Sequence, residues 1–249
     1  MIRKAIVMAA GKGTRMKSEL PKVLFQVCGR PMLFYVLDAL EAAGIEEIIT
    51  VIGYRGDLVR EAIQDRKGIR FAEQKEQLGT GHAVMMCRDI LKDTNDPVMV
   101  IAGDSPMIQA SSVNALFDEY NKIGNASCIL GTIHKDNPFG MGRILRDAKG
   151  NFTGIVEERD ATEEQKKITE INMSYYLFNT PDMLNALDGL KTNNNQHEYY
   201  ITDIPAILLG QNKKVYALPV LKPVECLGVN TLDDLAVVEA EMLKRHLDK

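Results

Sequence analysis

The most constraining feature of the sequence is an apolar run that leads directly into a glycine-rich loop near the N-terminus. Residues 5–8 (Ala-Ile-Val-Met) are consecutively apolar, a pattern typical of a buried strand in a parallel sheet. Residues 9–16 follow (Ala-Ala-Gly-Lys-Gly-Thr-Arg-Met), and their two glycines allow the backbone to bend sharply and approach a ligand closely. The combination predicts an α/β fold with a ligand site at the end of its first strand.

The same loop is suited to binding phosphate groups. Its backbone N–H groups can form an anion-binding concavity, and Arg15 and Lys22 add fixed positive charge beside it. Two other phosphate loops are excluded, because a Walker A loop needs Gly-x-x-x-x-Gly-Lys-Ser/Thr and a dinucleotide fingerprint needs Gly or Ala in place of Met16. We therefore predict polyphosphate handling, although the loop alone also fits an ordinary βα turn with two solvated cations.

Composition limits the class of protein. The 249 residues can bury a large core, and 26% charged with 45% apolar residues is ordinary for a globular protein. A net charge of −4 gives no support for binding to nucleic acid or to an anionic membrane. The cysteines are scattered, residues 1–4 lead straight into the first strand, and no apolar run could span a bilayer. We expect a cytoplasmic protein with reduced thiols; homo-oligomerisation stays open.

Hydrophobic periodicity predicts strands and helices in alternation over the first half of the chain. Expected strands cover 5–8, 48–52, 69–72, 98–101 and 127–133. Expected helices cover 32–43, 57–64, 80–91 and 111–123, the last capped by Ser111 or Ser112. The second half predicts a β-hairpin (143–146 and 152–156), a strand at 171–178, a helix capped by Thr180, a helix at 201–209, a strand at 214–219 and a terminal helix with Thr231 and Asp234 in a capping box. The expected fold is α/β, a doubly wound, Rossmann-like mixed sheet with a β-hairpin insertion.

The loop, taken with Pro21 and Lys22, resembles the signature of sugar-phosphate nucleotidyltransferases: Ala-Ala-Gly-x-Gly-Thr-Arg-Met followed by Pro-Lys. Enzymes of that family activate a sugar 1-phosphate with a nucleoside triphosphate. The resemblance implies the nucleotidyltransferase type of sheet, with a hairpin that binds sugar. It also implies catalytic roles for Arg15 and Lys22, and nucleotide contacts at Met8, Ala9, Ala10 and Gly11.

A second segment, residues 74–83 (Gln-Lys-Glu-Gln-Leu-Gly-Thr-Gly-His-Ala), places an amide, two glycines and a hydroxyl at a strand-to-helix turn. Such a turn can contact a nucleobase edge while its helix N-terminus faces phosphate, and it equally fits a capped helix start. It is similar to the uracil-binding segment of N-acetylglucosamine-1-phosphate uridylyltransferases, which implies that Gln74, Gly79 and Thr80 contact base and ribose. His82 alone is more often a packed helix residue than a catalyst.

A third motif ends an apolar strand in Gly103-Asp104, which presents one carboxylate at the carboxyl edge of the sheet. Beside a phosphate loop such a carboxylate suits Mg²⁺, which normally takes one or two protein oxygens and completes its shell with phosphate oxygens and water. The family resemblance implies that Gly103 contacts the nucleotide and that Asp104 and Asn230 are the metal ligands. Asn230 is also an ordinary turn residue before the Thr231 cap.

Residues 139–144, 154–157 and 170–172 are similar to the sugar pocket of the family. They imply that Gly142, Glu157 and Asn172 bind the sugar. The family usually has Asn-Thr-Gly where this chain has Asn172-Met173-Ser174. Because side chains alternate along a strand, we expect Ser174 to share a face with Asn172 and the pocket to admit N-acetylglucosamine 1-phosphate.

The combined resemblance implies transfer of UMP from UTP to N-acetylglucosamine 1-phosphate with Mg²⁺, giving pyrophosphate and UDP-N-acetylglucosamine, a cell-wall precursor. Residues 1–230 are expected to form the nucleotidyltransferase domain and 231–249 a linker-like helix. Bifunctional members of the family continue into a hexapeptide-repeat acetyltransferase domain, for which these residues leave no room. Two alternatives stay open: a uridylyl- or cytidylyltransferase for another sugar or polyol phosphate, and a non-catalytic regulatory domain that binds nucleotide sugar.

Overall fold

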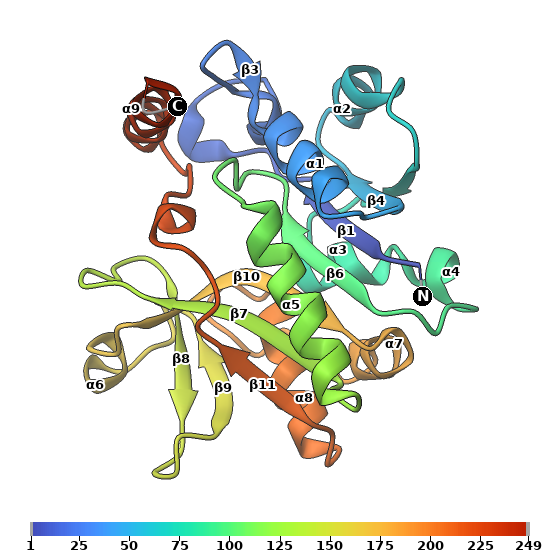
Figure 1. The fold of residues 1–249 in the computed structure, drawn as a ribbon, viewed down its shortest axis with the longest axis vertical. Coiled ribbons are helices and arrows are strands. Elements are labelled where there is room, and N and C mark those ends of the chain that lie inside the picture. Colours follow the sequence, from blue (N-terminus) through green and yellow to red (C-terminus); the bar gives the residue numbers. More distant parts are fainter. Residues whose placement is uncertain (1, 248–249) are drawn as a thin grey trace.

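A mixed, nine-stranded sheet organises residues 2–247, the part of the chain that the computed structural model describes (Figure 1). Its main path has the order β11-β7-β10-β6-β1-β4-β5. These strands are β1 (Lys4–Ala9), β4 (Glu47–Ile52), β5 (Ile69–Glu73), β6 (Val98–Ala102), β7 (Cys128–His134), β10 (Glu170–Phe178) and β11 (Val215–Leu218).

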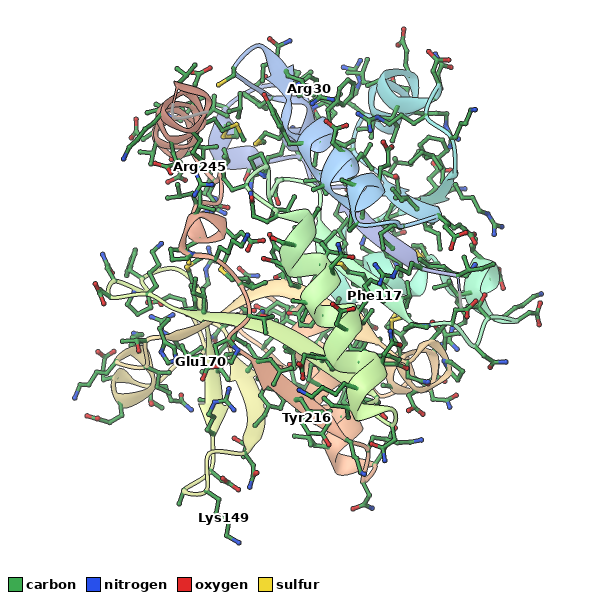
Figure 2. The ribbon with its side chains drawn as sticks, viewed as in Figure 1. Arg30, Phe117, Lys149, Glu170, Tyr216 and Arg245 are labelled. Atoms are coloured by element: carbon green, nitrogen blue, oxygen red, sulfur yellow. The ribbon has the colours of Figure 1, made fainter. Side chains whose placement is uncertain are left out.

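Strand directions make the sheet mixed, as predicted. β6, β1, β4 and β5 run parallel, and β7 and β11 run parallel to each other, but β10 is antiparallel to both β6 and β7. The predicted hairpin, β8 (Gly142–Arg146) and β9 (Phe152–Val156), joins the sheet through β8 on β10. It projects from the body of the molecule with Lys149 at its tip (Figure 2). A small separate sheet pairs β2 (Gln26–Val27) with β3 (Arg30–Pro31).

Helices cover both faces of the sheet. One core cluster holds α1 (Met32–Ala42), α2 (Gly56–Ile63) and α5 (Ala110–Ile123), the last through fully buried Phe117 (Figure 2). The other holds α3 (Thr80–Met85), α4 (Arg88–Leu91), α7 (Thr180–Leu187) and α8 (Ile204–Gly210). Successive residues of β1 point to opposite layers, Ala5 and Val7 to the first and Ile6 to the second. The doubly wound prediction is therefore confirmed.

Two predicted helix boundaries are wrong. The helix expected over 80–91 is two short helices, α3 and α4, separated at Met86 and Cys87, and Arg88 is tied to Asp188 after α7 at 2.6 Å. The side chain that caps α7 belongs to Asn179, which accepts a hydrogen bond from the Asp182 N–H; Thr180 is already helical.

The start of α5 is held by a residue far away in the sequence. Neither Ser111 nor Ser112 is its N-cap. The buried Glu225 carboxylate, on a short 3-10 helix (Pro223–Cys226), instead accepts from the Gln109 N–H at 3.0 Å and the Ser112 hydroxyl at 2.5 Å. A carboxylate at this position satisfies orphan donors and complements the helix dipole.

We therefore expect Glu225→Gln to lower the free energy of unfolding by about 1–3 kcal/mol, because an amide brings donors against donors in a buried site and removes the charge. Urea unfolding at equilibrium measures this difference. Glu119→Gln is the matched control, since Glu119 forms only an exposed ion pair with Lys122, a kind of pair worth about 0–1 kcal/mol. An unchanged midpoint for Glu225→Gln would show that the capping contact is not stabilising.

The last described helix, α9 (Leu232–Leu247), begins with the predicted capping box, in which Asp234 and Thr231 exchange hydrogen bonds at 2.9 and 3.2 Å. Its Val238 and Met242 pack with Met16 and Met32, so α9 lies beside the signature loop (Figure 1). Asp248 and Lys249, the end of the predicted linker-like helix, lie outside the described residues, and the division at residue 230 stays a prediction. No helix within 2–247 combines the length and apolar character needed to cross a membrane.

Candidate active site

Two cavities meet at the carboxyl ends of β1 and β6. One has a volume of about 270 Å³ and the other about 210 Å³, and both are lined by Ala102 and Asp104. Ala102 is the last residue of β6, so Asp104 stands just beyond the strand. This is the sheet edge at which the sequence predicts a ligand site.

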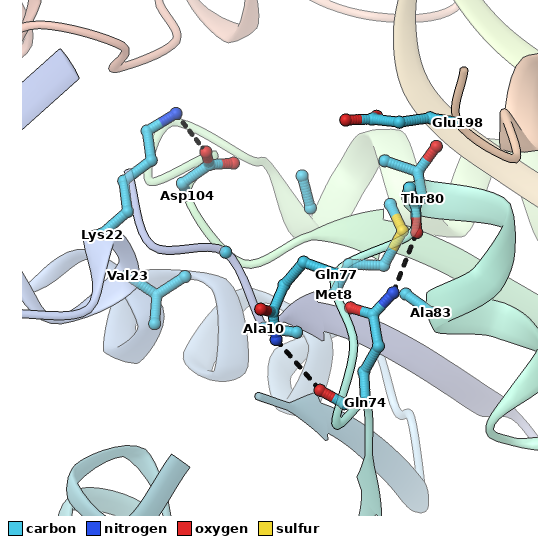
Figure 3. Close-up of a pocket in the computed structure, with 13 residues that line it drawn as sticks. Met8, Ala10, Lys22, Val23, Gln74, Gln77, Thr80, Ala83, Asp104 and Glu198 are labelled. Carbon is cyan, nitrogen blue, oxygen red and sulfur yellow. Dashed lines mark hydrogen bonds and ion pairs between the residues drawn. The ribbon is translucent and has the colours of Figure 1, made fainter. Parts of the chain in front are cut away.

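The larger cavity, called here the nucleotide cavity, collects most of the residues predicted to contact the nucleotide (Figure 3). They are Met8, Ala10, Gly11, Gln74, Gly79 and Thr80. Ala9 and Gly103 are not among its lining residues. The Ala9 side chain packs in the core, and the Gly103 N–H donates to the Met8 carbonyl at 2.9 Å, which ties β6 to β1. Their predicted nucleotide contacts stay predictions.

Sequence reasoning missed part of this lining. Val23, Gln77, Ala83 and Glu198 also line the nucleotide cavity (Figure 3). Gln77 lies within the 74–83 segment, and its side-chain amide donates to the Gln74 carbonyl at 3.1 Å. Glu198 lies more than 100 positions downstream of Gln77, so local sequence does not connect it with this segment.

The second glycine of the signature has a packing role. Gly13 adopts φ 66°, and a Cβ there would lie 2.7 Å from Lys22 Cβ. Only glycine fits this left-handed, crowded position. Gly13 thus lets the loop close onto Lys22 and fixes where that lysine stands.

Lys22 contacts both predicted metal ligands, and Arg15 contacts one of them. Lys22 Nζ lies 2.5 Å from the Asp104 carboxylate and donates to Asn230 Oδ1 at 3.0 Å. Arg15 also donates to Asn230 Oδ1, at 3.0 Å. Residues separated by more than 200 positions therefore form one charged cluster at the junction of the two cavities. Arg15 itself lines a third cavity of about 500 Å³, which borders the other two.

The cluster has the chemistry of a magnesium site. Carboxylate and amide oxygens are hard ligands, and here both contact the same ammonium group, so a cation already sits between them. Among residues 2–247 no group of three or more His, Cys, Asp or Glu is arranged to hold a metal. A metal on Asp104 and Asn230 would thus need substrate oxygens and water to complete its coordination shell. Mg²⁺ is commonly bound in this way, with few protein ligands.

The helix N-terminus at residues 79–81 is partly covered by the segment after Glu198. The Gly81 N–H is used by the Tyr199 carbonyl at 2.7 Å, and the Thr80 hydroxyl accepts from the Ile201 N–H at 3.1 Å. Gly79 adopts φ 109°, and a Cβ there would lie 2.5 Å from the Tyr199 carbonyl oxygen. The Gly81 N–H is therefore taken, and a phosphate contact at this helix end stays a prediction.

Gln74 presents one defined polar atom to the nucleotide cavity. It is 3% exposed, and its amide nitrogen contacts the Gly79 carbonyl at 3.0 Å and His82 Nδ1 at 3.1 Å. Its amide oxygen points away from the hydrogen bond that the amide nitrogen makes with the Gly79 carbonyl (Figure 3). Within 2–247 the Gly79 N–H has no protein acceptor, although Gly79 lines the cavity. The wall therefore offers an acceptor, Gln74 Oε1, and a donor, Gly79 N–H.

The smaller cavity, called here the sugar cavity, brings together Gly142, Glu157 and Asn172, as the sequence predicted. Desolvation raises the pKa of the Glu157 carboxyl against an opposing hydrogen bond from Thr202, and the charges of Asp160 and Asp203 raise it further. Asn172 accepts from the Ser174 N–H at 3.2 Å and donates to the Tyr176 hydroxyl at 2.7 Å. Since an amide can make about four hydrogen bonds, Asn172 keeps donor and acceptor capacity for a ligand.

Strand alternation fails at Met173 and Ser174. The register of β10 against β7 shifts between Asn172 and Tyr175, and Ser174 adopts φ 58°. Both residues therefore line the sugar cavity, where simple alternation predicted only Ser174. The family pattern has glycine at this position, the residue that adopts a positive φ without strain.

An ion pair with a buried arginine holds the loop at residues 140–142, which lines the sugar cavity. Arg143 is 1% exposed and donates to Glu158 at 2.7 Å, and it also contacts the Met141 carbonyl. The same Glu158 accepts from the Gly140 N–H at 3.2 Å. The pair therefore holds residues 140–142, which line the cavity, in one conformation.

The chain resembles known proteins over nearly its whole length. The chain is 45% identical to the bifunctional protein GlmU of Heliobacterium modesticaldum over 98% of its length, and 43% identical to that of Clostridium novyi over 100%. It spans about half of these relatives, 52% and 54%. A crystal structure of UDP-glucose pyrophosphorylase with UDP-glucose superposes with a TM-score of 0.77 at 20% identity, covering 98% of this chain and 100% of that one. It shows a shared fold.

The remaining comparison concerns the domain itself. The sequence pattern of the MobA-like NTP transferase domain matches residues 5–168, about two-thirds of the chain, from β1 through the nucleotide cavity and into the hairpin. With that match, the chain belongs to the MobA-like NTP transferase domain family.

Proposed function

We propose that this chain transfers UMP from UTP to N-acetylglucosamine 1-phosphate, releasing pyrophosphate and forming UDP-N-acetylglucosamine. The observation that carries the proposal is the cluster of Arg15, Lys22, Asp104 and Asn230 at the junction of the two cavities. A nucleotide in one cavity and a sugar phosphate in the other would bring their phosphates together there. The likeness to N-acetylglucosamine-1-phosphate uridylyltransferases supports the choice of both substrates.

The reaction needs positioning and charge neutralisation. An oxygen of the sugar phosphate attacks the α-phosphorus of UTP, the new P–O bond forms, and the bond to pyrophosphate breaks. That oxygen is already anionic, so no protein nucleophile or base is required. Lys22 and Arg15 offset negative charge on the facing phosphates. Asp104 and Asn230 would hold Mg²⁺, which would offset further negative charge on the phosphates.

The nucleotide cavity supports uracil as the base. Uracil presents an N–H donor beside carbonyl acceptors, which matches Gln74 Oε1 and the Gly79 N–H. Cytosine presents a ring-nitrogen acceptor at the corresponding position, which would face the Gln74 oxygen unpaired. A buried polar group left without a partner costs about 1–3 kcal/mol. The match of uracil to Gln74 Oε1 and the Gly79 N–H favours UTP over CTP, and it therefore argues against the cytidylyltransferase alternative.

A pyrophosphate-release assay with four nucleoside triphosphates and several sugar 1-phosphates tests the proposal. We expect the highest kcat/KM for UTP with N-acetylglucosamine 1-phosphate. Glucose 1-phosphate should be poorer by about 1–3 kcal/mol of activation free energy, the amount that a small contact in a pocket supplies. A preference for CTP or for glucose 1-phosphate would replace the named substrates. No release with any pair, together with tight nucleotide binding by calorimetry, would favour the regulatory alternative.

A further inference from the structure

We infer that His82 is a positioning residue for the base, because it fixes which end of the Gln74 amide faces the nucleotide cavity. This inference rests on the proposed function for its substrate. Its structural basis is the contact between Gln74 Nε2 and His82 Nδ1 at 3.1 Å, inside a wall where Gln74 is 3% exposed. His82 is absent from the lining of the cavity and acts only through Gln74.

The direction of this hydrogen bond follows from the neighbouring one. The Gly79 carbonyl can only accept, so the atom of Gln74 that faces it at 3.0 Å is the amide nitrogen. That nitrogen is a donor, and His82 Nδ1 must then accept its second hydrogen. The ring proton of His82 therefore resides on Nε2. Both amide hydrogens are used, and the amide oxygen is left for the ligand.

The backbone of Gln74 leaves little other freedom. Its N–H donates to the Ile52 carbonyl at 2.8 Å, continuing the β4–β5 ladder, and its carbonyl accepts from the Gln77 side chain at 3.1 Å. The choice that remains is the orientation of the amide. If the amide turned over, its oxygen would face the Gly79 carbonyl and the Nδ1 lone pair together. The Gly79 carbonyl and His82 Nδ1 therefore strongly favour one orientation of the Gln74 amide, and that orientation favours one edge of the base.

His82 has a second contact that must be separated from this one. Its ring stacks on the ring of Tyr199, with centroids 6.3 Å apart. Tyr199 is the first residue of the segment that covers the start of α3. Two substitutions divide the roles. His82→Phe keeps an aromatic ring for the stacking but has no acceptor. His82→Asn gives up the ring but keeps an oxygen acceptor at the position of Nδ1.

The first experiment compares kcat/KM for UTP and for CTP, at saturating sugar phosphate, in the wild type and both variants. We expect the UTP/CTP ratio to fall about tenfold or more in His82→Phe, because the buried amide loses one of its two acceptors and only the Gly79 carbonyl then favours its orientation. His82→Asn should keep the ratio within about threefold of the wild type. The KM for sugar phosphate should not move in either variant. The reverse order, with Phe normal and Asn impaired, would overturn the inference in favour of ring packing.

A second measurement reads the hydrogen bond without any turnover. In ¹⁵N–¹H spectra of the free protein, the Gln74 side-chain amide, assigned by its disappearance in Gln74→Glu, should exchange slowly with solvent in the wild type and in His82→Asn. It should exchange faster in His82→Phe. A protected amide in a wild type that does not use UTP would refute the proposed function and leave the positioning role standing. An amide equally exposed to exchange in all three proteins would refute the positioning role.

Discussion

Asp104→Ala is expected to lower kcat for pyrophosphate release by about 10³-fold, equivalent to about 4 kcal/mol, while the fold survives. Asp104 is the one carboxylate that lines both cavities, and it supplies the only full negative charge in the proposed Mg²⁺ ligand pair among the described residues. Its removal would leave Asn230 as the single protein ligand. Steady-state kinetics over a range of Mg²⁺ concentrations measures the effect.

Two further variants sharpen this test. Asp104→Asn keeps an oxygen ligand but removes the charge, so it should recover part of the activity at high Mg²⁺. Asp118→Ala is the matched control, because Asp118 is an exposed carboxylate on α5 that lines none of the three cavities near the cluster. Full turnover by Asp104→Ala, or by the wild type in excess EDTA, would exclude the proposed metal role.

Lys22→Ala is expected to lower kcat/KM by about 10²–10³-fold, which corresponds to about 2–4 kcal/mol for one charged group that no longer stabilises the transition state. Lys22 is held by the Gly13 turn, and it is the cation that contacts both Asp104 and Asn230. Arg15→Ala should have an effect of the same order, because Arg15 reaches the same asparagine from the third cavity.

Lys17→Ala provides the control for overall charge. Lys17 is an exposed lysine of the same loop that lines none of the three cavities, and its removal changes the net charge by the same amount. We expect its kcat/KM to stay within about twofold of the wild type, as for a surface charge far from a ligand. Near-normal rates for both Lys22→Ala and Arg15→Ala would make the loop structural and remove the basis of the proposed mechanism.

The sequence predicted the fold class and the parallel half of the sheet because those features are local. The strands β1, β4 and β6 are buried on both faces and are therefore mostly apolar, and each is followed by a turn or a helical period. The residues of the charged cluster were also named from motifs. Arg15 and Asp104 follow β1 and β6, parallel neighbours whose carboxyl ends meet at one sheet edge. Asn230 reaches them from the segment before α9, which that rule does not place.

Only the tertiary structure determined which distant segments of the chain are in contact. Glu225 caps α5 in place of the adjacent serines, because a buried carboxylate can reach donors that a short side chain leaves open. The carbonyl of Tyr199 takes the Gly81 N–H at the start of α3, a contact that the residues around Gly81 do not indicate. The shift in β10 at Ser174 breaks the alternation that the sequence implied. His82 looked like an ordinary helix residue, since nothing in its neighbours shows that its ring nitrogen contacts the Gln74 amide, on which we propose that the choice of base depends. Local sequence determines backbone preference and burial, whereas the hydrogen-bond partner of a polar side chain depends on which segments the complete fold brings together.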